Sequence, residues 1–101
     1  MNGLTAEYNN KVGPILRSGE IASAVVEAVQ EDNPGKQFRI SDHMAYVRVE
    51  TDGECIIRRS TMEDILGRAF RMQEIEVDLS SFAGQIELNE DQVRFYFTKT
   101  L

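Results

Sequence analysis

Hydrophobic residues recur along the first half of the chain at two spacings, one typical of strands and one typical of helices. Residues 12–17 are mostly apolar and predict a strand, whereas residues 18–31 carry apolar side chains at helical spacing and predict a helix. Residues 37–41 and 45–50 alternate between apolar and polar side chains, which predicts two further strands. Because Pro14 has no backbone N–H, we expect the first strand to lie at a sheet edge or to begin irregularly.

The middle of the chain predicts a hairpin followed by a short helix. Asp52-Gly53 is a pair typical of hairpin turns, so we expect residues 55–59 to form the partner of the preceding strand. Ser60 and Glu63 have the spacing of a capping box, in which each side chain bonds the backbone at the other position. A second helix is therefore expected to begin at Ser60 and to stop at Gly67.

The last third of the chain predicts mainly strands. Residues 74–79 alternate between acidic and apolar side chains, which predicts a strand with its carboxylates on one face. This acidic face is either a solvated sheet face or an acidic docking patch, and the pattern leaves both interpretations open. Residues 80–84 predict a loop, and residues 85–88 and 93–98 predict a closing hairpin.

The two halves of the chain look alike, since each has a strand, a helix expected to be capped by a serine (Ser18 or Ser60) and then further strands. Residues 14–18 and 56–60 even share an apolar run that ends in Arg-Ser. The pattern predicts the α+β class, with two β-α-β-β units in one compact domain and a mainly antiparallel sheet packed on two helices. Residues 1–11 are expected to form a flexible tail and residues 12–101 the domain.

Acidic residues outnumber basic residues by 17 to 11, which gives the 101-residue chain a net charge of -6. This sign argues against nucleic acid as a partner, because phosphate contacts need a basic surface. Four arginines gather around the predicted second helix, at Arg58, Arg59, Arg68 and Arg71. They either pair with acidic residues within the fold or form the basic part of a bipolar docking surface.

The sequence contains no run of about 20 apolar residues that could span a membrane, and its first residues lack the apolar core of a signal peptide. Cys55 is the only cysteine, so no disulfide can form within the chain. The cytoplasm is therefore the expected compartment, with neither membrane nor nucleic acid as a partner.

Most active-site chemistry needs residue types that this sequence lacks. His43 is the only histidine, and we interpret it as a solvent-facing turn residue, whereas catalytic triads and most zinc sites need histidine. Cys55 lies in a predicted strand and is interpreted as a buried small residue rather than a nucleophile. We therefore predict no catalytic, cofactor-binding or metal-binding residues.

Several short motifs together resemble one known family. The runs Leu66-Gly67-Arg68-Ala69-Phe70 and Val77-Asp78-Leu79-Ser80-Ser81, followed by Gly84, resemble the effector proteins that include component B of soluble methane monooxygenase. The resemblance to the effector proteins of toluene monooxygenases is closer. It is carried by residues 10–15, 32–36, 45–48, 81–86 and 94–97, so it covers nearly the whole chain beyond the tail.

The resemblance implies a function through a partner. Effectors of bacterial toluene/xylene multicomponent monooxygenases carry no cofactor and bind a hydroxylase whose di-iron centre activates O2. They reshape its active site and couple electron transfer to hydroxylation, while a Rieske ferredoxin and a reductase supply the electrons. The chain is then a non-catalytic regulatory subunit, expected to be a monomer when free, and the family fold implies the same duplicated β-α-β-β unit.

The resemblance also indicates where the hydroxylase docks. The family's loop after the Val-Asp pair faces the hydroxylase, and here that loop contains Ser80, Ser81, Phe82 and Ala83. Together with Gly84 and the turn Asn33, Pro34 and Gly35, these residues are the expected partner interface. Phe82 is either an anchor of this interface or a core residue that caps the sheet.

Three other functions are alternatives to a regulatory subunit. A stand-alone hydrolase or isomerase would need an active-site constellation, and a small-ligand module would need an apolar pocket. A generic interaction adaptor has the same physical features as an effector, so only the family resemblance favours the effector.

Overall fold

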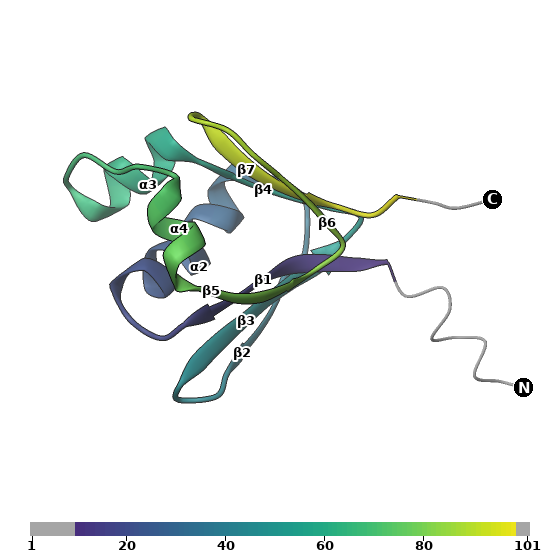
Figure 1. Cartoon of the computed structure of the whole chain (residues 1–101). Helices are drawn as coiled ribbons and strands as arrows, with labels where there is room; N and C mark the ends of the chain where they lie inside the picture. The colour runs from purple at the N-terminus through teal and green to yellow at the C-terminus, as the bar shows by residue number, and fades with distance from the viewer. Residues whose placement is uncertain (1–9, 99–101) are drawn as a thin grey trace, which may run out of the picture.

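Residues 10–98 are the part of the chain that the structure, a computed structural model, describes, and they form two antiparallel sheets and three helices (Figure 1). The elements are β1 (Lys11–Arg17), α2 (Glu20–Asp32), β2 (Arg39–Asp42), β3 (Tyr46–Asp52), β4 (Glu54–Arg58), α3 (Arg59–Leu66), α4 (Gln73–Asp78), β5 (Leu79–Ala83), β6 (Gln85–Leu88) and β7 (Gln92–Tyr96). The predicted α+β class and the closing hairpin of β6 and β7 are confirmed. Residues 1–9 of the predicted tail lie outside the described residues, and Lys11 is the first residue of β1.

The strand order reveals the duplication that the sequence predicts. One sheet has the order β2-β3-β1-β5 and the other has the order β4-β7-β6. The unit β1-α2-β2-β3 therefore corresponds to β4-α3-β6-β7, because β3 and β7 each pair with the two other strands of their unit. The second unit contains an insertion, α4 and β5, and β5 pairs with β1 of the first unit. Residues 10–98 therefore form two sheets and three helices, and the prediction of one sheet and two helices is corrected.

The first strand does not lie at an edge, because β1 is placed between β3 and β5. The edge position expected from Pro14 is wrong, and Pro14 pairs with Phe82 of β5 just before an irregularity in the ladder. The register of β1 with β5 shifts between Ile15 and Leu16. Next to the proline, a Cβ on Gly13 would lie 2.0 Å from the carbonyl oxygen of Val49, so glycine is what allows β1 and β3 to approach this closely.

Asp52-Gly53 does not form the predicted hairpin, because β3 and β4 belong to different sheets. The strand that contains Cys55 pairs with β7 and places that residue opposite Phe95. Gly53 carries the chain from one sheet to the other with a φ of +81°. Its N–H donates to the carbonyl of Asn10, and its carbonyl accepts the N–H of Phe97, so both ends of the described chain are fastened to this crossing point.

Neither of the predicted serine caps forms. Gly19 precedes α2 with no side chain bonded to the helix start, so Ser18 lies one residue too early to cap it. Because β4 runs directly into α3, no residue is left between them, and Ser60 lies in the first turn of the helix. Glu63 accepts the backbone N–H of Phe70 at 3.0 Å and so fixes the loop after the helix rather than its start.

The strand predicted for residues 74–79 is also wrong, since residues 73–78 form the helix α4. Positions two apart lie on nearly opposite sides of a helix, and Ile75 is accordingly 1% exposed while Val77 is 76% exposed. The helix start is fixed by Glu74, whose N–H donates to the carbonyl of Arg71 and whose carboxylate accepts the N–H of the same residue. The alternating acidic residues therefore do not line up on one face.

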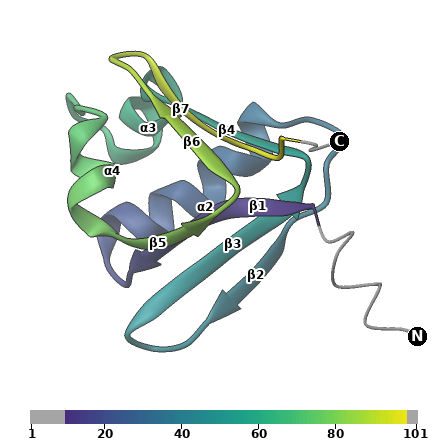
Figure 2. The ribbon, with the colours of Figure 1, turned by 45° about the vertical axis from the view of Figure 1, so that its right-hand side comes forward.

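The hydrophobic core lies where α2 packs against the sheets. This helix buries Ile21, Val25 and Val29 and contacts both α3 and β4. The helices lie on the left in Figure 1, and Figure 2 shows α4 leading directly into β5. Of the helices within residues 10–98, none has the length and apolar character that crossing a membrane requires.

Candidate functional site

The predicted docking loop is the edge strand β5, which pairs with β1 along one side only. The prediction of a loop at residues 80–84 is therefore wrong, although the segment does lie at the surface. Ser80, Ser81 and Phe82 are all exposed, and Ala83 is half-buried. Consecutive side chains of a strand point to opposite faces, so β5 presents exposed side chains on both of its faces at these positions. This arrangement leaves the strand accessible to a protein partner.

Phe82 is packed against the fold on one side and exposed on the other. Its side chain is 38% exposed, and its ring lies 5.9 Å from the ring of Phe95, centre to centre, at an angle of 49°. Phe95 belongs to the other sheet and is fully buried. One side of Phe82 therefore covers the junction of the two sheets, while the remainder is available for contact.

Gly84 has a structural reason to be glycine. It connects β5 to β6 in the other sheet with a φ of +90°. A Cβ at this position would lie 2.7 Å from the carbonyl oxygen of Tyr96 and 2.7 Å from a methyl carbon of Val12. The glycine thus allows the chain to pass close to both sheets, and it fixes where β5 ends.

The side chain of Asn33 is used inside the fold. It is 6% exposed, and its Nδ2 donates to the carbonyls of Val29 and Ile56, both at 2.8 Å. Its Oδ1 accepts the N–H of Ile56 at 2.9 Å, so the amide ties the end of α2 to β4. Pro34 and Gly35, by contrast, are exposed.

The structure does not join the two predicted docking segments into one surface patch. The turn after α2 is fastened to β4 through Asn33 and to β3 through Lys36, whose Nζ donates to the carbonyl of Asp52. β5 lies beyond β1 in the first sheet, separated by that strand from β3. A partner that used both segments would therefore have to contact two parts of the fold.

The tip of the hairpin that joins β2 and β3 is exposed and apolar, which the sequence pattern did not predict. Ile40, Met44 and Tyr46 on this hairpin are three of the six large hydrophobic residues that stand exposed among residues 10–98. His43 is exposed at the same tip, as predicted, and its ring lies 5.1 Å from that of Tyr46. The signal available in the sequence is Met44 itself, because methionine is unusual in a turn otherwise made of Asp42 and His43.

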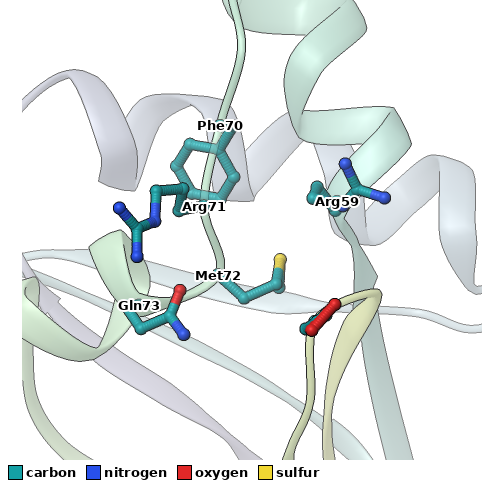
Figure 3. Close-up of a pocket in the computed structure, with 6 residues that line it drawn as sticks. Arg59, Phe70, Arg71, Met72 and Gln73 are labelled. Carbon is teal, nitrogen blue, oxygen red and sulfur yellow. The ribbon is translucent and has the colours of Figure 1, made fainter.

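A polar cleft of about 300 Å³ opens beside α3 and α4 (Figure 3). Its lining comes from α3, α4, the loop between them and the β6–β7 turn, and consists of Arg59, Phe70, Arg71, Met72, Gln73 and Glu90. Figure 3 shows Arg59 across the cleft from Arg71 and Gln73. The guanidinium of Arg59 is already paired with Asp91 at 3.3 Å and Glu63 at 3.7 Å.

The guanidinium of Arg68 is likewise paired with acidic residues of the same chain. Arg68 contacts Glu74 at 3.3 Å and Glu20 at 3.2 Å, and these two partners raise the pKa of its guanidinium. The pKa of Glu74 is lowered, first by the hydrogen bond from the backbone N–H of Arg71 and then by Arg68. For Arg59 and Arg68 the structure therefore supports pairing within the fold over a bipolar docking surface.

Cys55 is fully buried in β4, as the sequence predicts. Burial raises the pKa of its thiol to about 12, so the sulfur stays protonated near neutral pH and is a poor nucleophile. Within residues 10–98, no group of three or more His, Cys, Asp or Glu side chains is placed to hold a metal ion.

Comparison with known proteins identifies relatives along almost the whole chain. The MmoB/DmpM family matches residues 10–96. The effector subunit of the alkene monooxygenase system of Xanthobacter autotrophicus (strain Py2) is 41% identical over 87% of both chains. The stimulatory component DmpM of phenol 2-monooxygenase from Pseudomonas sp. (strain CF600) is 38% identical over 76% of this chain and 83% of its own length.

Solved structures show the same fold. A chain in the phenol hydroxylase–regulatory protein complex superposes with a TM-score of 0.76 at 27% identity, covering 87% of this chain and 99% of its own length. Regulatory protein B of soluble methane monooxygenase superposes with a TM-score of 0.66 at 17% identity, over 89% of this chain and 67% of its own length.

Proposed function

We propose, from the premise that this chain belongs to the MmoB/DmpM family, that it is the cofactor-free effector protein of a bacterial multicomponent monooxygenase. It binds the di-iron hydroxylase of that system and is not itself the catalyst. The observation that carries this proposal is the match over residues 10–96, together with two relatives that are named an effector subunit and a stimulatory component.

The mechanism follows from how a binding protein changes a reaction on another chain. It shifts the hydroxylase between conformations by its differential affinity for them, and a coupling of about 1–3 kcal/mol is ordinary for such a shift. The favoured conformation is the one in which electron transfer and O2 activation lead to hydroxylation of the substrate. A specific interface for this purpose buries about 800 Å² on each partner.

More specifically, we propose that the hydroxylase partner belongs to a toluene or xylene monooxygenase system. This assignment is supported by the sequence motifs that resemble toluene monooxygenase effectors, and it brings a Rieske ferredoxin and a reductase as electron donors. The substrate pocket belongs to the hydroxylase, so the choice among aromatic substrates is made on that chain. The effector acts in the cytoplasm and is a monomer before it binds.

The docking residues we propose lie on β5 and on the turn after α2. Ser80, Ser81 and Phe82 are the exposed contacts, and half-buried Ala83 supports them. Pro34 and Gly35 are exposed contacts of the turn. Asn33 and Gly84 act as positioning residues, because their geometry is committed to the fold.

The proposal is tested by reconstitution. The hydroxylase, ferredoxin and reductase of the same organism are assayed with toluene, with and without this protein, and the product formed per NADH consumed is measured. We expect both the product rate and this ratio to rise and to saturate near one effector per hydroxylase active site. Serum albumin at the same concentration is the control. An unchanged ratio at saturating protein contradicts the proposal, and turnover by the purified chain alone favours a stand-alone enzyme.

A further inference from the structure

The tip of the β2–β3 hairpin has a backbone geometry that does not suit its sequence. Met44 adopts a φ of +69°, in the left-handed region that residues other than Gly, Asn and Asp seldom occupy. The other described residues with positive φ are all glycines: Gly13, Gly19, Gly35, Gly53, Gly67 and Gly84. Met44 is also 90% exposed, the largest exposure among the large hydrophobic residues of this part of the chain.

Local hydrogen bonds hold this conformation in place. The N–H of Met44 donates to Oδ1 of Asp42 at 2.8 Å, and the N–H of His43 donates to the carbonyl of Tyr46 at 2.8 Å. The carbonyl of Ala45 accepts the N–H of Ser18 at 3.0 Å, which fastens the tip to the segment after β1. Met44 is therefore presented on a fixed turn, so that little ordering is needed when a partner binds it.

The surface beside the tip is apolar as well. A groove of about 280 Å³ runs between α2 and the hairpin, and its lining is Ala22, Ser23, Val26, Ile40, Asp42 and Val47. Ile40 thus belongs both to the groove and to the exposed apolar residues of the hairpin. The groove carries one charge, the carboxylate of Asp42, which a basic group on a partner would complement.

We propose that Met44 is a second contact with the hydroxylase and inserts into an apolar pocket of that protein, beside a basic side chain that pairs with Asp42. This inference rests on the proposed function. A strained backbone, an exposed apolar side chain and a rigid turn coincide at one residue, and conformations of this kind persist where they serve a site. An anionic lipid surface and a second copy of this chain fit less well, because the net charge of -6 is repelled by both.

Two substitutions separate a binding role from a structural one. Met44→Gly removes the backbone strain and the side chain together, and Met44→Asn keeps a residue type that tolerates the left-handed region. If Met44 serves the fold alone, neither variant should affect binding. We expect both to unfold at or above the temperature of the original protein, and to bind the hydroxylase about tenfold more weakly, as for a residue at the centre of an interface. Met44→Leu, which keeps an apolar side chain at the tip, is the matched control and should bind nearly as well as the original.

The experiment uses the full chain and the purified hydroxylase, with calorimetric titration for affinity and thermal unfolding for stability. The original protein is titrated first, so failure of that titration contradicts the proposed function rather than this inference. If the original protein binds the hydroxylase and both Met44→Gly and Met44→Asn bind it as tightly as the original does, the inference is overturned. It is equally overturned if the loss of Met44 abolishes self-association, or binding to phosphatidylglycerol vesicles, while affinity for the hydroxylase is unchanged.

Discussion

Replacing Asn33 with alanine should remove the amide that joins the end of α2 to the outer edge of β4. In the structure this amide bonds both the N–H and the carbonyl of Ile56, so it pairs with β4 much as a neighbouring strand would. A third bond reaches the carbonyl of Val29 inside α2. At about 1 kcal/mol for each hydrogen bond, the substitution should lower the free energy of unfolding by about 3 kcal/mol.

A loss of this size is measurable by two methods. Urea denaturation followed by circular dichroism gives the free energy of unfolding, and for a domain of this length we expect the midpoint of thermal unfolding to fall by about 12–24 °C. Asn33→Asp is the informative companion variant, because its carboxylate would face the carbonyls of Val29 and Ile56. Ionisation is disfavoured there, so the deficit relative to the original should grow as pH rises from 4 to 7.

Loss of the Asn33 amide should affect stability and function differently. Well below the unfolding temperature, Asn33→Ala should still support turnover at saturating concentration, because the residue positions the turn without contacting the partner. A stability loss below about 1 kcal/mol would refute the view that the amide holds this junction. A normal fold with abolished turnover would refute the positioning role.

Two further predictions concern the exposed edge and the buried thiol. Phe82→Ala should weaken activation of the hydroxylase about tenfold, as for an interface anchor. Phe97→Ala removes a ring of similar exposure and should change the activation little. Equal effects of the two substitutions would contradict a docking role for Phe82. Cys55 should react with a disulfide reagent far more slowly in the native protein than in urea at pH 8, and rapid native labelling would show that the thiol is not sequestered. Burial raises the pKa of the Cys55 thiol from its ordinary value of 9.0 to about 12, so the folded protein keeps this proton to higher pH. The contribution of Cys55 to stability should therefore decline as pH rises from 9 toward 12.

The predictions from sequence that the structure contradicts share a physical cause. Alternation at residues 74–79 fits a strand, but the hydrogen bonds of Glu74 with Arg71 and the burial of Ile75 stabilise a helical turn instead. Asp52-Gly53 satisfies the rule for a hairpin, yet the same geometry also allows a chain to change sheets. In each case the local pattern is compatible with two structures, and contacts with distant residues select one.

The candidate site also has some features that the local sequence predicts and others that contacts between distant residues decide. The motifs of the sequence place the surface segment at residues 80–84 and identify the family, because those residues are local in the chain. They do not reveal that Asn33 is buried, since its partner Ile56 is 23 positions away. The exposed tip at Met44 is likewise hidden, because exposure is the absence of neighbours and can be read only when all the neighbours are placed.

The sequence by itself determined which stretches are helical or extended over most of the chain, the repetition of the β-α-β-β unit, and the burial of Cys55. These follow from the spacing of apolar residues, which acts over a few positions. Only the tertiary structure decided which sheet each strand joins, that β1 is an inner strand, and that Gly53 and Gly84 lie at two of the points where the chain crosses between sheets. Strand partners are chosen by burial in a shared core, and that free energy depends on residues far apart in the chain.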